Sequence, residues 1–485
     1  MEFPASIIIV GSGVFGLSTA YAMTRDPVYA NTTITIVDAW DFEVSSTKES
    51  SGNPRSANFD TSRIIRSEYP HSAYANLARE SQTLWRGEWG ADGRYVGQKL
   101  LLSARGSSMK GERKKFETIN YVKNAFELSR KTAKSQESLQ ILDSPSEIRR
   151  MLGPVSSRAL ENEVQNDKSD SKILRGYLSG DCGWADGCAS IKWLREQVIR
   201  SERLNVRTGF VRELVVANQD NLPGSKASVR GVKLSDGDEI YADLVIVAAG
   251  SHTPYILGMK ELCDVYSEVV AYIKLTTEEC NEFRKRKVPI IVNADQCVFA
   301  IGPDNDGYLK LGRFSYSGYA DVRSCGGVEV GPRVRVNSSV FEQDSDKAFG
   351  WGGEIENLEP WNLKESVKNT LSEYRIFLEE FFGTIPGGEP DCLSDIARRP
   401  FAKVRQCWYT DTPSTDFIVD YHPAFGKSVF VATGGSDHAF KFLPVIGQKV
   451  AAIVLEHRGL MSSSRGPTLD ELCRLWKFPD AESKL

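Results

Sequence analysis

Residues 7–20 read Ile7-Ile8-Ile9-Val10-Gly11-Ser12-Gly13-Val14-Phe15-Gly16-Leu17-Ser18-Thr19-Ala20, and this stretch decides the fold. The β-branched run before Gly11 is typical of a buried parallel strand, and a helix is expected to follow it. Gly11 permits the tight turn, Gly13 lets the backbone approach a pyrophosphate, and Gly16 lets the helix lie close to the sheet. This G-x-G-x-x-G pattern predicts a dinucleotide site at the helix N-terminus.

A second strand supports the dinucleotide site. Residues 33–37 (TITIV) follow the first helix and end at Asp38. An acid at the end of this strand is placed to bind a ribose hydroxyl. Val14 and Phe15 lie in the glycine turn and complete the predicted contact surface. An ordinary strand-turn-helix unit without a ligand is the alternative.

Composition excludes several classes of protein. The 485 residues suffice for two or three domains, and a hydrophobic content of 41% supports sizeable cores. A net charge of −4 gives no indication of a nucleic-acid or anionic membrane surface. No stretch approaches the roughly 18 apolar residues of a membrane span. The nine cysteines lack zinc-site spacing, so we expect no metal site, no disulfide framework and a reducing compartment.

The chain ends in Ser483-Lys484-Leu485, which is a peroxisomal address. No signal peptide precedes the first strand, which starts near Ile7. We therefore expect recognition by the peroxisomal import receptor and a location in the peroxisome. A chance tripeptide is the alternative.

Two later segments repeat the strand-then-glycine pattern, at residues 244–250 (LVIVAAG) and 429–435 (VFVATGG). Small residues at the end of a central strand let the backbone pass close to a nucleotide. Other local patterns predict one strand over residues 95–104, a strand with a turn over residues 205–211, and a last helix over residues 444–455.

The order of these segments predicts an α/β protein with two domains. Residues 1–98, 179–256 and 408–485 are expected to form a discontinuous, Rossmann-like dinucleotide-binding domain with a parallel central sheet. Residues 99–178 and 257–407 are expected to form a mainly antiparallel domain that carries substrate and catalytic groups.

Three stretches taken together resemble one family. They are residues 7–20, residues 62–66 (SRIIR), and the pair formed by residues 406–413 (QCWYTDTP) and 432–441 (ATGGSDHAFK). Over nearly its whole length the chain resembles the flavoproteins of the D-amino-acid-oxidase type. Within them it is similar to the branch of monomeric sarcosine oxidase, pipecolate oxidase and the fungal fructosyl amino acid oxidases (amadoriases).

The resemblance implies FAD as the cofactor. In that branch the 8α-methyl carbon of FAD is linked to a cysteine in a C-x-x-T-x-T-P run, which Cys407 matches; a buried inert thiol is the alternative. Lys310 matches a lysine that the family places over the flavin to activate oxygen, because a fixed positive charge stabilises superoxide as it forms. Arg63 matches a second cation near the flavin ring. An outward-facing strand lysine is the alternative for Lys310.

The resemblance also implies a substrate site. Arg66 and Lys441 match the pair that binds the substrate carboxylate, and a guanidinium fork with a lysine point charge suits that task. Tyr69 matches a residue of the substrate pocket, and Lys441 is also expected near the flavin. Surface cations are the alternative for Arg66 and Lys441. The further positions that match family residues around the cofactor are Ser56, Val211, Gly250, Gly434, Asp437 and His438.

Two positions depart from the pattern of the fructosyl amino acid oxidases. Phe314 stands where those enzymes carry a glutamate that binds sugar hydroxyls, and Phe478 stands where they carry the arginine of an Arg-Pro pair. Loss of these polar partners weighs against a sugar-bearing substrate. The two phenylalanines would instead stack on an aromatic or apolar amine substituent.

We therefore expect an FAD-dependent oxidase of a secondary-amine amino acid, N-methylated or otherwise N-substituted and in some cases aromatic. It would oxidise the C–N bond to an imine and reduce O2 to hydrogen peroxide, as a monomer. Some fungal members of this branch act in alkaloid-type biosynthesis. The alternatives are a fructosyl amino acid, pipecolate or sarcosine oxidase, an NAD-dependent dehydrogenase, and a non-catalytic flavin-binding protein.

Overall fold

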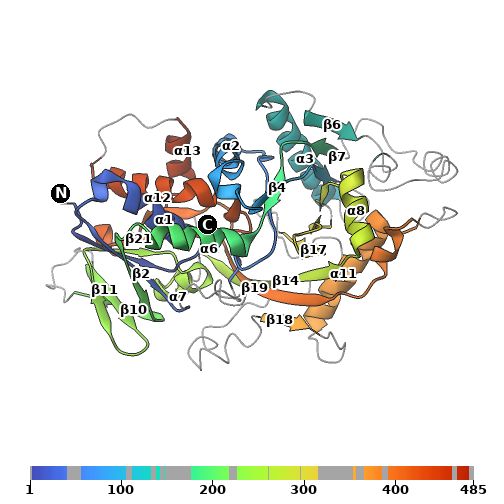
Figure 1. The fold of residues 1–485 in the computed structure, drawn as a ribbon. Helices are drawn as coiled ribbons and strands as arrows, with labels where there is room; N and C mark the ends of the chain where they lie inside the picture. Colours follow the sequence, from blue (N-terminus) through green and yellow to red (C-terminus); the bar gives the residue numbers. More distant parts are fainter. Residues whose placement is uncertain are drawn as a thin grey trace.

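The computed structural model describes most of the chain (Figure 1). The described residues are 3–40, 56–104, 112–132, 138–142, 147, 176–217, 227–259, 262–294, 296–314, 353–356, 365–384, 391–460 and 467–479. The predicted peroxisomal address at residues 483–485 lies outside them. Within these ranges, no helix combines the length and the hydropathy that a membrane span requires.

A six-stranded sheet forms the first layer of the fold. In spatial order its strands are β20 (Ile418–Tyr421), β21 (Val429–Thr433), β13 (Leu244–Val247), β1 (Ser6–Val10), β2 (Thr33–Asp38) and β9 (Leu204–Thr208). All neighbours pair in parallel except β20 with β21. The glycine-turn strand β1 is central, as its apolar run predicts.

The alternation of β1 places its side chains in two different cores. Ile7 and Ile9 pack with helices on one face, whereas Ile8 and Val10 pack on the other face. The helices are α1 (Val14–Arg25), α2 (Ser72–Trp85), α6 (Gly187–Ile199) and α12 (Leu443–His457). The opposite face is covered by an antiparallel sheet of β10 (Val211–Val216), β11 (Val229–Leu234) and β12 (Glu239–Tyr241), with the short helix α7 (Thr253–Ile256) nearby.

A nine-stranded sheet forms the second part of the molecule. Its order is β18 (Gly353–Glu356), β19 (Lys403–Asp411), β14 (Asp264–Lys274), β17 (Tyr308–Arg313), β16 (Val298–Ile301), β15 (Ile290–Asn293), β5 (Leu100–Ser103), β7 (Gly176–Ser179) and β6 (Leu139–Leu142). Only β15 and β5 pair in parallel. Helices α8 (Thr277–Arg286) and α11 (Glu365–Phe382) pack on this sheet, and α3 (Glu112–Thr132) packs near β5 and β7. The predicted α/β class with a mainly antiparallel second domain is confirmed.

Two local predictions were wrong in their extent. The strand expected over residues 95–104 is divided, because β4 (Tyr95–Gly97) joins a small sheet with β3 (Arg63–Ile65) and β8 (Gly183–Ala185), whereas β5 joins the large sheet. The strand with a turn expected over residues 205–211 is confirmed, since β9 ends at Thr208 and β10 begins at Val211. Helix α12 is not the last helix, since α13 (Pro467–Leu475) follows it. Leu472 of α13 is buried in the core between the six-stranded sheet and its helices.

Strands β14 and β19 connect the two parts of the molecule. They pair from Asp264 with Asp411 to Tyr272 with Lys403, and Figure 1 shows them extending from the first part into the second. The domain boundary predicted at residue 408 therefore falls inside β19. The other predicted boundaries fall between strands of different sheets or at the end of β7.

Candidate active site

The turn between β1 and α1 requires glycine for steric reasons. Gly11 has a φ of +99°, and a Cβ there would lie 2.5 Å from the carbonyl oxygen of Ala248. A Cβ on Gly16 would lie 1.9 Å from the carbonyl oxygen of Gly11. Among the described residues, a Cβ on Gly13 would meet Asn58 alone, at 3.9 Å. The first and last glycines thus allow close packing, and the middle one leaves open space where a pyrophosphate is expected.

Asp38 closes the other side of this turn. Its carboxylate accepts hydrogen bonds from the backbone N–H groups of Ser12 (2.6 Å) and Trp40 (2.8 Å). These bonds fix the acid at the end of β2, beside the glycine turn. The position is the one expected for an acid that binds ribose hydroxyls.

A cavity of about 420 Å³ extends from the glycine turn to Arg63 and Tyr409. Ten predicted cofactor positions line it: Gly11, Gly13, Val14, Phe15, Asp38, Ser56, Arg63, Val211, Gly250 and Asp437. Residues that the sequence did not suggest also line it, including Ser12, Trp40, Asn58, Arg195, Phe210, His252, Trp408 and Tyr409. The predicted positions outside its described walls are Gly16, Cys407, Gly434, His438 and Lys441.

The loop after β21 reaches the far part of this cavity in an uncommon conformation. Gly434, Ser436 and Asp437 have φ values of +72°, +44° and +58°. Positive φ at non-glycine residues is uncommon and is concentrated at ligand sites. Asp437 is held there because its carboxylate accepts a hydrogen bond from Tyr266.

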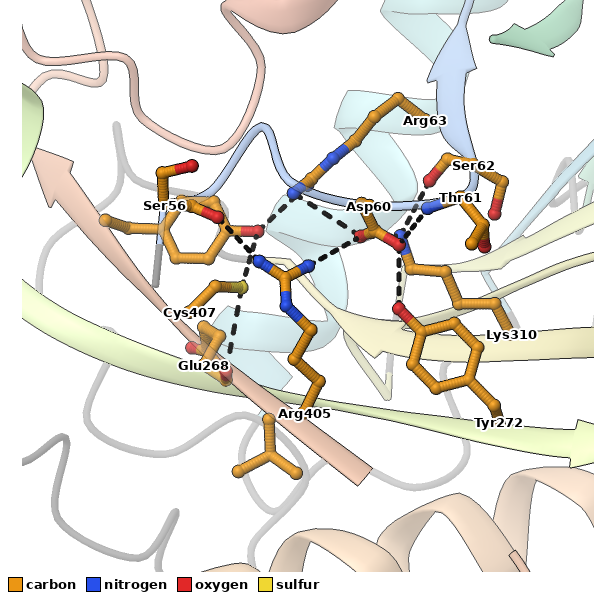
Figure 2. A network of polar contacts seen from close by, with 12 residues as sticks. Ser56, Asp60, Thr61, Ser62, Arg63, Glu268, Tyr272, Lys310, Arg405 and Cys407 are labelled. Carbon is orange, nitrogen blue, oxygen red and sulfur yellow. Dashed lines mark hydrogen bonds and ion pairs between the residues drawn. The ribbon is translucent and has the colours of Figure 1, made fainter. Parts of the chain in front are cut away.

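Lys310 lies on β17 in a buried polar network (Figure 2). The side chain is 1% exposed, so the alternative of an outward-facing strand lysine is wrong. The ammonium donates to the Asp60 carboxylate at 2.5 Å and to the backbone oxygen of Ser62 at 2.7 Å. The Tyr272 hydroxyl donates to the other Asp60 oxygen at 2.7 Å. Arg405 approaches the same carboxylate at 3.9 Å.

Arg63 and Cys407 belong to the same network, as Figure 2 shows. Arg63 forms an ion pair with Asp60 at 3.4 Å and donates to the Tyr409 hydroxyl at 2.9 Å. The Cys407 thiol is buried, and its sulfur lies 3.4 Å from that hydroxyl. The structure therefore brings Lys310, Arg63 and Cys407 together from three strands, although Cys407 lies beside the described cavity wall rather than on it.

Burial and charge act against each other in this network. Burial would raise the pKa of Asp60, but the charges of Lys310, Arg63 and Arg405 outweigh it and hold that pKa below its usual range. Burial lowers the pKa of Lys310 to about 8, although Asp60 opposes the shift. The pKa of Arg63 is raised, because Tyr409 and Asp60 outweigh burial.

A second cluster gathers the predicted carboxylate-binding groups. The Arg66 guanidinium and the Lys441 ammonium each lie 5.2 Å from the centre of the Tyr69 ring. Arg66 also donates to Tyr121 at 3.0 Å and to the backbone oxygen of Glu68. Lys441 is buried, which lowers its pKa well below the ordinary value, and the charge of Arg66 lowers it further.

Lys441 begins a chain of hydrogen bonds. It donates to the Tyr69 hydroxyl at 2.8 Å, which lies 3.0 Å from Nδ1 of His438. Nε2 of His438 lies 3.0 Å from the carbonyl oxygen of Thr415, which can only accept, so Nε2 carries the proton. Burial lowers the pKa of His438 to about 3, so the imidazole is neutral. Both ring nitrogens are thus used within the protein, and the His438 side chain lies away from the described cofactor cavity.

The two phenylalanines that depart from the family pattern lie in different hydrophobic clusters. The Phe314 ring lies tilted beside that of Phe299, with centroids 6.4 Å apart, and the Phe299 ring lies 5.6 Å from the Lys310 ammonium. Phe478 instead contacts His422 and packs against the core that includes Ile8 and Val10. The expectation that both would form one substrate surface is therefore wrong, and Phe314 alone remains near the network.

Comparison with known proteins identifies the family. The FAD dependent oxidoreductase family matches residues 6–453. The chain is 48% identical to the amino acid oxidase imqH of Aspergillus flavus, over 100% of this chain and 99% of that protein. It is 46% identical to the amino acid oxidase fsqB of Aspergillus fumigatus, over 99% of each. Its fold matches that of the fructosamine oxidase Amadoriase II of Aspergillus fumigatus, with a TM-score of 0.64, 21% identity, and coverage of 98% and 90% of the two chains.

The chain belongs to the FAD-dependent oxidoreductase family. This confirms the predicted family and cofactor, and the described residues of this FAD-dependent oxidoreductase fit FAD. The cavity joins the glycine turn at one end to Arg63 at the other, as a dinucleotide requires. The space beside Gly13 is open, and Nε of Arg63 is buried with no hydrogen-bond partner within the described ranges. A buried donor of that kind is expected to face a ligand.

Four members of this oxidoreductase's polar network were not predicted from the sequence: Asp60, Tyr272, Arg405 and Tyr409. Asp60 stands in a polar segment that precedes Arg63, where an acid is unremarkable. Arg405 carried little signal, because Lys403 and Gln406 beside it are also polar, whereas Lys310 stands between Leu309 and Leu311. Tyr272 carried none, since a tyrosine in a strand is ordinary.

Proposed function

We propose that this protein oxidises a secondary-amine amino acid to its imine and reduces O2 to hydrogen peroxide. The observation that supports this proposal best is that one short segment, residues 63–66, contributes an arginine to each of two clusters of cations. Arg63 joins Lys310 and Cys407, and Arg66 joins Lys441 around Tyr69. The names of the two Aspergillus amino acid oxidases support the same class of substrate.

The chain's own groups have separate tasks in this proposal. Arg66 and Lys441 bind the substrate carboxylate. The Tyr69 hydroxyl accepts a hydrogen bond from Lys441 and so orients the ammonium. FAD, held by the cavity residues between Gly11 and Arg63, would supply the two-electron chemistry that takes a hydride from the carbon next to the amine and returns two electrons to O2. Lys310 and Arg63 place positive charge where oxygen gains electrons. No histidine base is assigned, because His438 is neutral and both its nitrogens are engaged.

We also propose how FAD is attached, where in the cell the protein is located and what its oligomeric state is. Cys407 is proposed to carry FAD as a thioether at the 8α carbon; its sulfur lies within the Arg63 and Tyr409 network, which supports this. The terminal Ser483-Lys484-Leu485 is proposed to direct the protein to peroxisomes through the import receptor. We propose a monomer.

A substrate panel tests the proposed function. The purified yellow protein is incubated with N-methyl amino acids, aromatic and aliphatic, with pipecolate and sarcosine, and with fructosyl-valine and fructosyl-lysine. Peroxide release and product mass are measured. Peroxide from N-methyl or aromatic amino acids supports the proposal, whereas turnover of the fructosyl compounds alone would replace it with an amadoriase. Absence of peroxide from every compound would remove the proposed substrate class.

Phe314 is expected to favour aromatic substrates. An aromatic contact contributes about 0.5–1.5 kcal/mol beyond its buried area, so Phe314→Ala should reduce the ratio of kcat/KM for aromatic over aliphatic N-methyl amino acids by roughly two- to tenfold. The matched control is Phe478→Ala, since Phe478 packs against His422 instead. An unchanged ratio in Phe314→Ala would exclude this contact.

Binding of a carboxylate is expected to weaken as pH rises. The groups that face Lys441 are Arg66, Glu68, Tyr69, Asp437 and His438. Burial lowers the pKa of Lys441, so the amine is charged only below that lowered pKa, and a bound carboxylate favours the charged form.

The affinity should therefore be greatest at low pH and fall by up to about tenfold per pH unit above the lowered pKa. Titration with acetate or benzoate, read from the flavin absorbance at several pH values, checks this. Lys441→Met should bind weakly and lose the pH dependence. A wild-type affinity that stays constant with pH would contradict a role for Lys441.

A further inference from the structure

Asp60 lies at the centre of the polar network in Figure 2 and has no assigned task. Its side chain is fully buried. One carboxylate oxygen accepts from the Tyr272 hydroxyl at 2.7 Å and from the Thr61 backbone at 2.8 Å. The other accepts from Lys310 at 2.5 Å. The carboxylate is therefore held from three segments of the chain, and its orientation is fixed.

Asp60 and Ser62 together determine where Lys310 can point. An ammonium has three N–H donors. Two of these donors are directed to the Asp60 carboxylate and to the Ser62 backbone oxygen. Both acceptors lie in the segment that leads into β3. Within the described residues they are the hydrogen-bond acceptors of this ammonium, so its third N–H is left for a bound group.

The same carboxylate is needed to keep a buried ammonium charged. The charged or titratable groups that face Lys310 are Asp60, Arg63, Tyr272, Arg405 and Cys407. Burial lowers the pKa of Lys310 to about 8, and the Arg63 charge also lowers it, whereas Asp60 is the strongest opposing influence. An uncharged lysine could not stabilise negative charge on oxygen.

We propose that Asp60 is a positioning residue that keeps the Lys310 ammonium charged and directs its free N–H toward the site of oxygen reduction. Tyr272 assists by fixing the carboxylate. The inference rests on the proposed oxygen-activating function of Lys310. It adds that this function depends on a carboxylate which touches neither substrate nor oxygen.

Asp60→Asn tests the proposal, because the amide keeps the shape of the side chain and removes its charge. The rate constant for oxidation of the photoreduced holoenzyme by O2 is measured from pH 5.5 to 9.5, beside wild type. Loss of a carboxylate at this distance should move the pH at which oxygen reactivity declines to lower pH by about one to three pH units. At pH 8 the variant should therefore react at least about fivefold more slowly, and the rates of the two proteins should approach each other at the lowest pH. Reduction by substrate should change little.

A double-mutant cycle separates this proposal from the proposed function of Lys310. If Asp60 acts through Lys310, Asp60→Asn should slow the reaction with oxygen in the wild-type background. It should not slow that reaction further in the Lys310→Met background. A further loss in that background would overturn the inference, and so would a wild-type pH profile in Asp60→Asn. If Lys310→Met itself reacts with oxygen normally, the proposed function of Lys310 fails first, and the inference fails with it.

Thermal unfolding provides a readout that is independent of turnover. Each single variant removes one side of the buried ion pair between Lys310 and Asp60, so each should lower Tm, and the double variant should lose less than the sum of the two shifts. Strict additivity of the Tm shifts would contradict the coupling.

Tyr272→Phe is a second variant for the case in which Asp60→Asn does not fold. It removes one hydrogen bond to Asp60 and should shift the oxygen pH profile in the same direction by a smaller amount. Tyr29→Phe is the matched control, because it removes another fully buried hydroxyl, which bonds Ala451 in the first core. A profile in Tyr272→Phe that coincides with the control would overturn the role of Tyr272.

Discussion

Replacement of Lys310 by methionine is expected to slow oxidation of the reduced enzyme by oxygen by about 10²- to 10³-fold, which is the usual effect of removing one preorganised electrostatic group. Methionine nearly matches the length of the lysine stem, so packing against Phe299 is retained while the charge is lost. Reduction by substrate should change little, because the carboxylate-binding groups Arg66 and Lys441 lie in the other cluster. Stopped-flow measurement of the two half-reactions separates these effects.

The control for that experiment is Lys274→Met. Lys274 pairs in register with Tyr308 on the neighbouring strand and is exposed, so its charge is screened by water. It should leave both half-reactions within about twofold of wild type. An oxygen step of normal speed in Lys310→Met would refute the role assigned to Lys310.

Replacement of Cys407 by alanine is expected to abolish covalent attachment of the cofactor. Acid precipitation of wild type should leave the yellow colour in the pellet, whereas the variant should release its flavin into the supernatant or contain none. The physical reason is that the link requires a sulfur nucleophile, and the Cys407 sulfur lies in the network of Arg63 and Tyr409.

Cys263→Ala is the matched control, since Cys263 is also a buried free thiol and packs in the core beneath β11. Its pellet should stay yellow. A yellow pellet from Cys407→Ala would place the link at another residue, and a colourless wild-type pellet would show that FAD is bound without a covalent bond.

The first strand and its turn were predictable because local sterics determine them. Gly11 and Gly16 face backbone oxygens at distances that no side chain allows, so the sequence pattern carries the structure directly. Lys310 was named from the family resemblance and from its apolar neighbours Leu309 and Leu311, and its side chain is buried. The family match confirms the flavoprotein that these signals indicated.

The partners of Lys310 could not be predicted in the same way. Asp60, Tyr272 and Arg405 come from three distant segments, and their meeting depends on the register between β14 and its neighbours. Register follows from tertiary packing and cannot be deduced from the composition of a strand. For the same reason the split between β4 and β5 was missed, because a chain that passes from one sheet to another keeps its apolar pattern.

Helix α13 was missed for a different reason. Leu469, Leu472 and Trp476 repeat at helical spacing, and Leu472 and Trp476 are fully buried, so the signal was present in the sequence. The separation of Phe314 from Phe478, by contrast, could be seen only in the structure, because the sequence shows two aromatic residues and gives no indication of where each one packs.

The pairing of β14 with β19 has a consequence for how such enzymes diversify. Strand β19 carries Arg405, Cys407 and Tyr409, and the chain continues from it into β20 of the other sheet. A change in the pairing of β14 with β19 would disturb both the cofactor site and the junction of the two sheets. The outer strands β5, β6 and β7 lie at the opposite edge of the nine-stranded sheet. The described walls of the cofactor cavity include no residue of β5, β6 or β7, so substitutions in those strands leave the β14–β19 pair unchanged. Recombination between relatives should therefore exchange those strands and keep β14 and β19 as one unit.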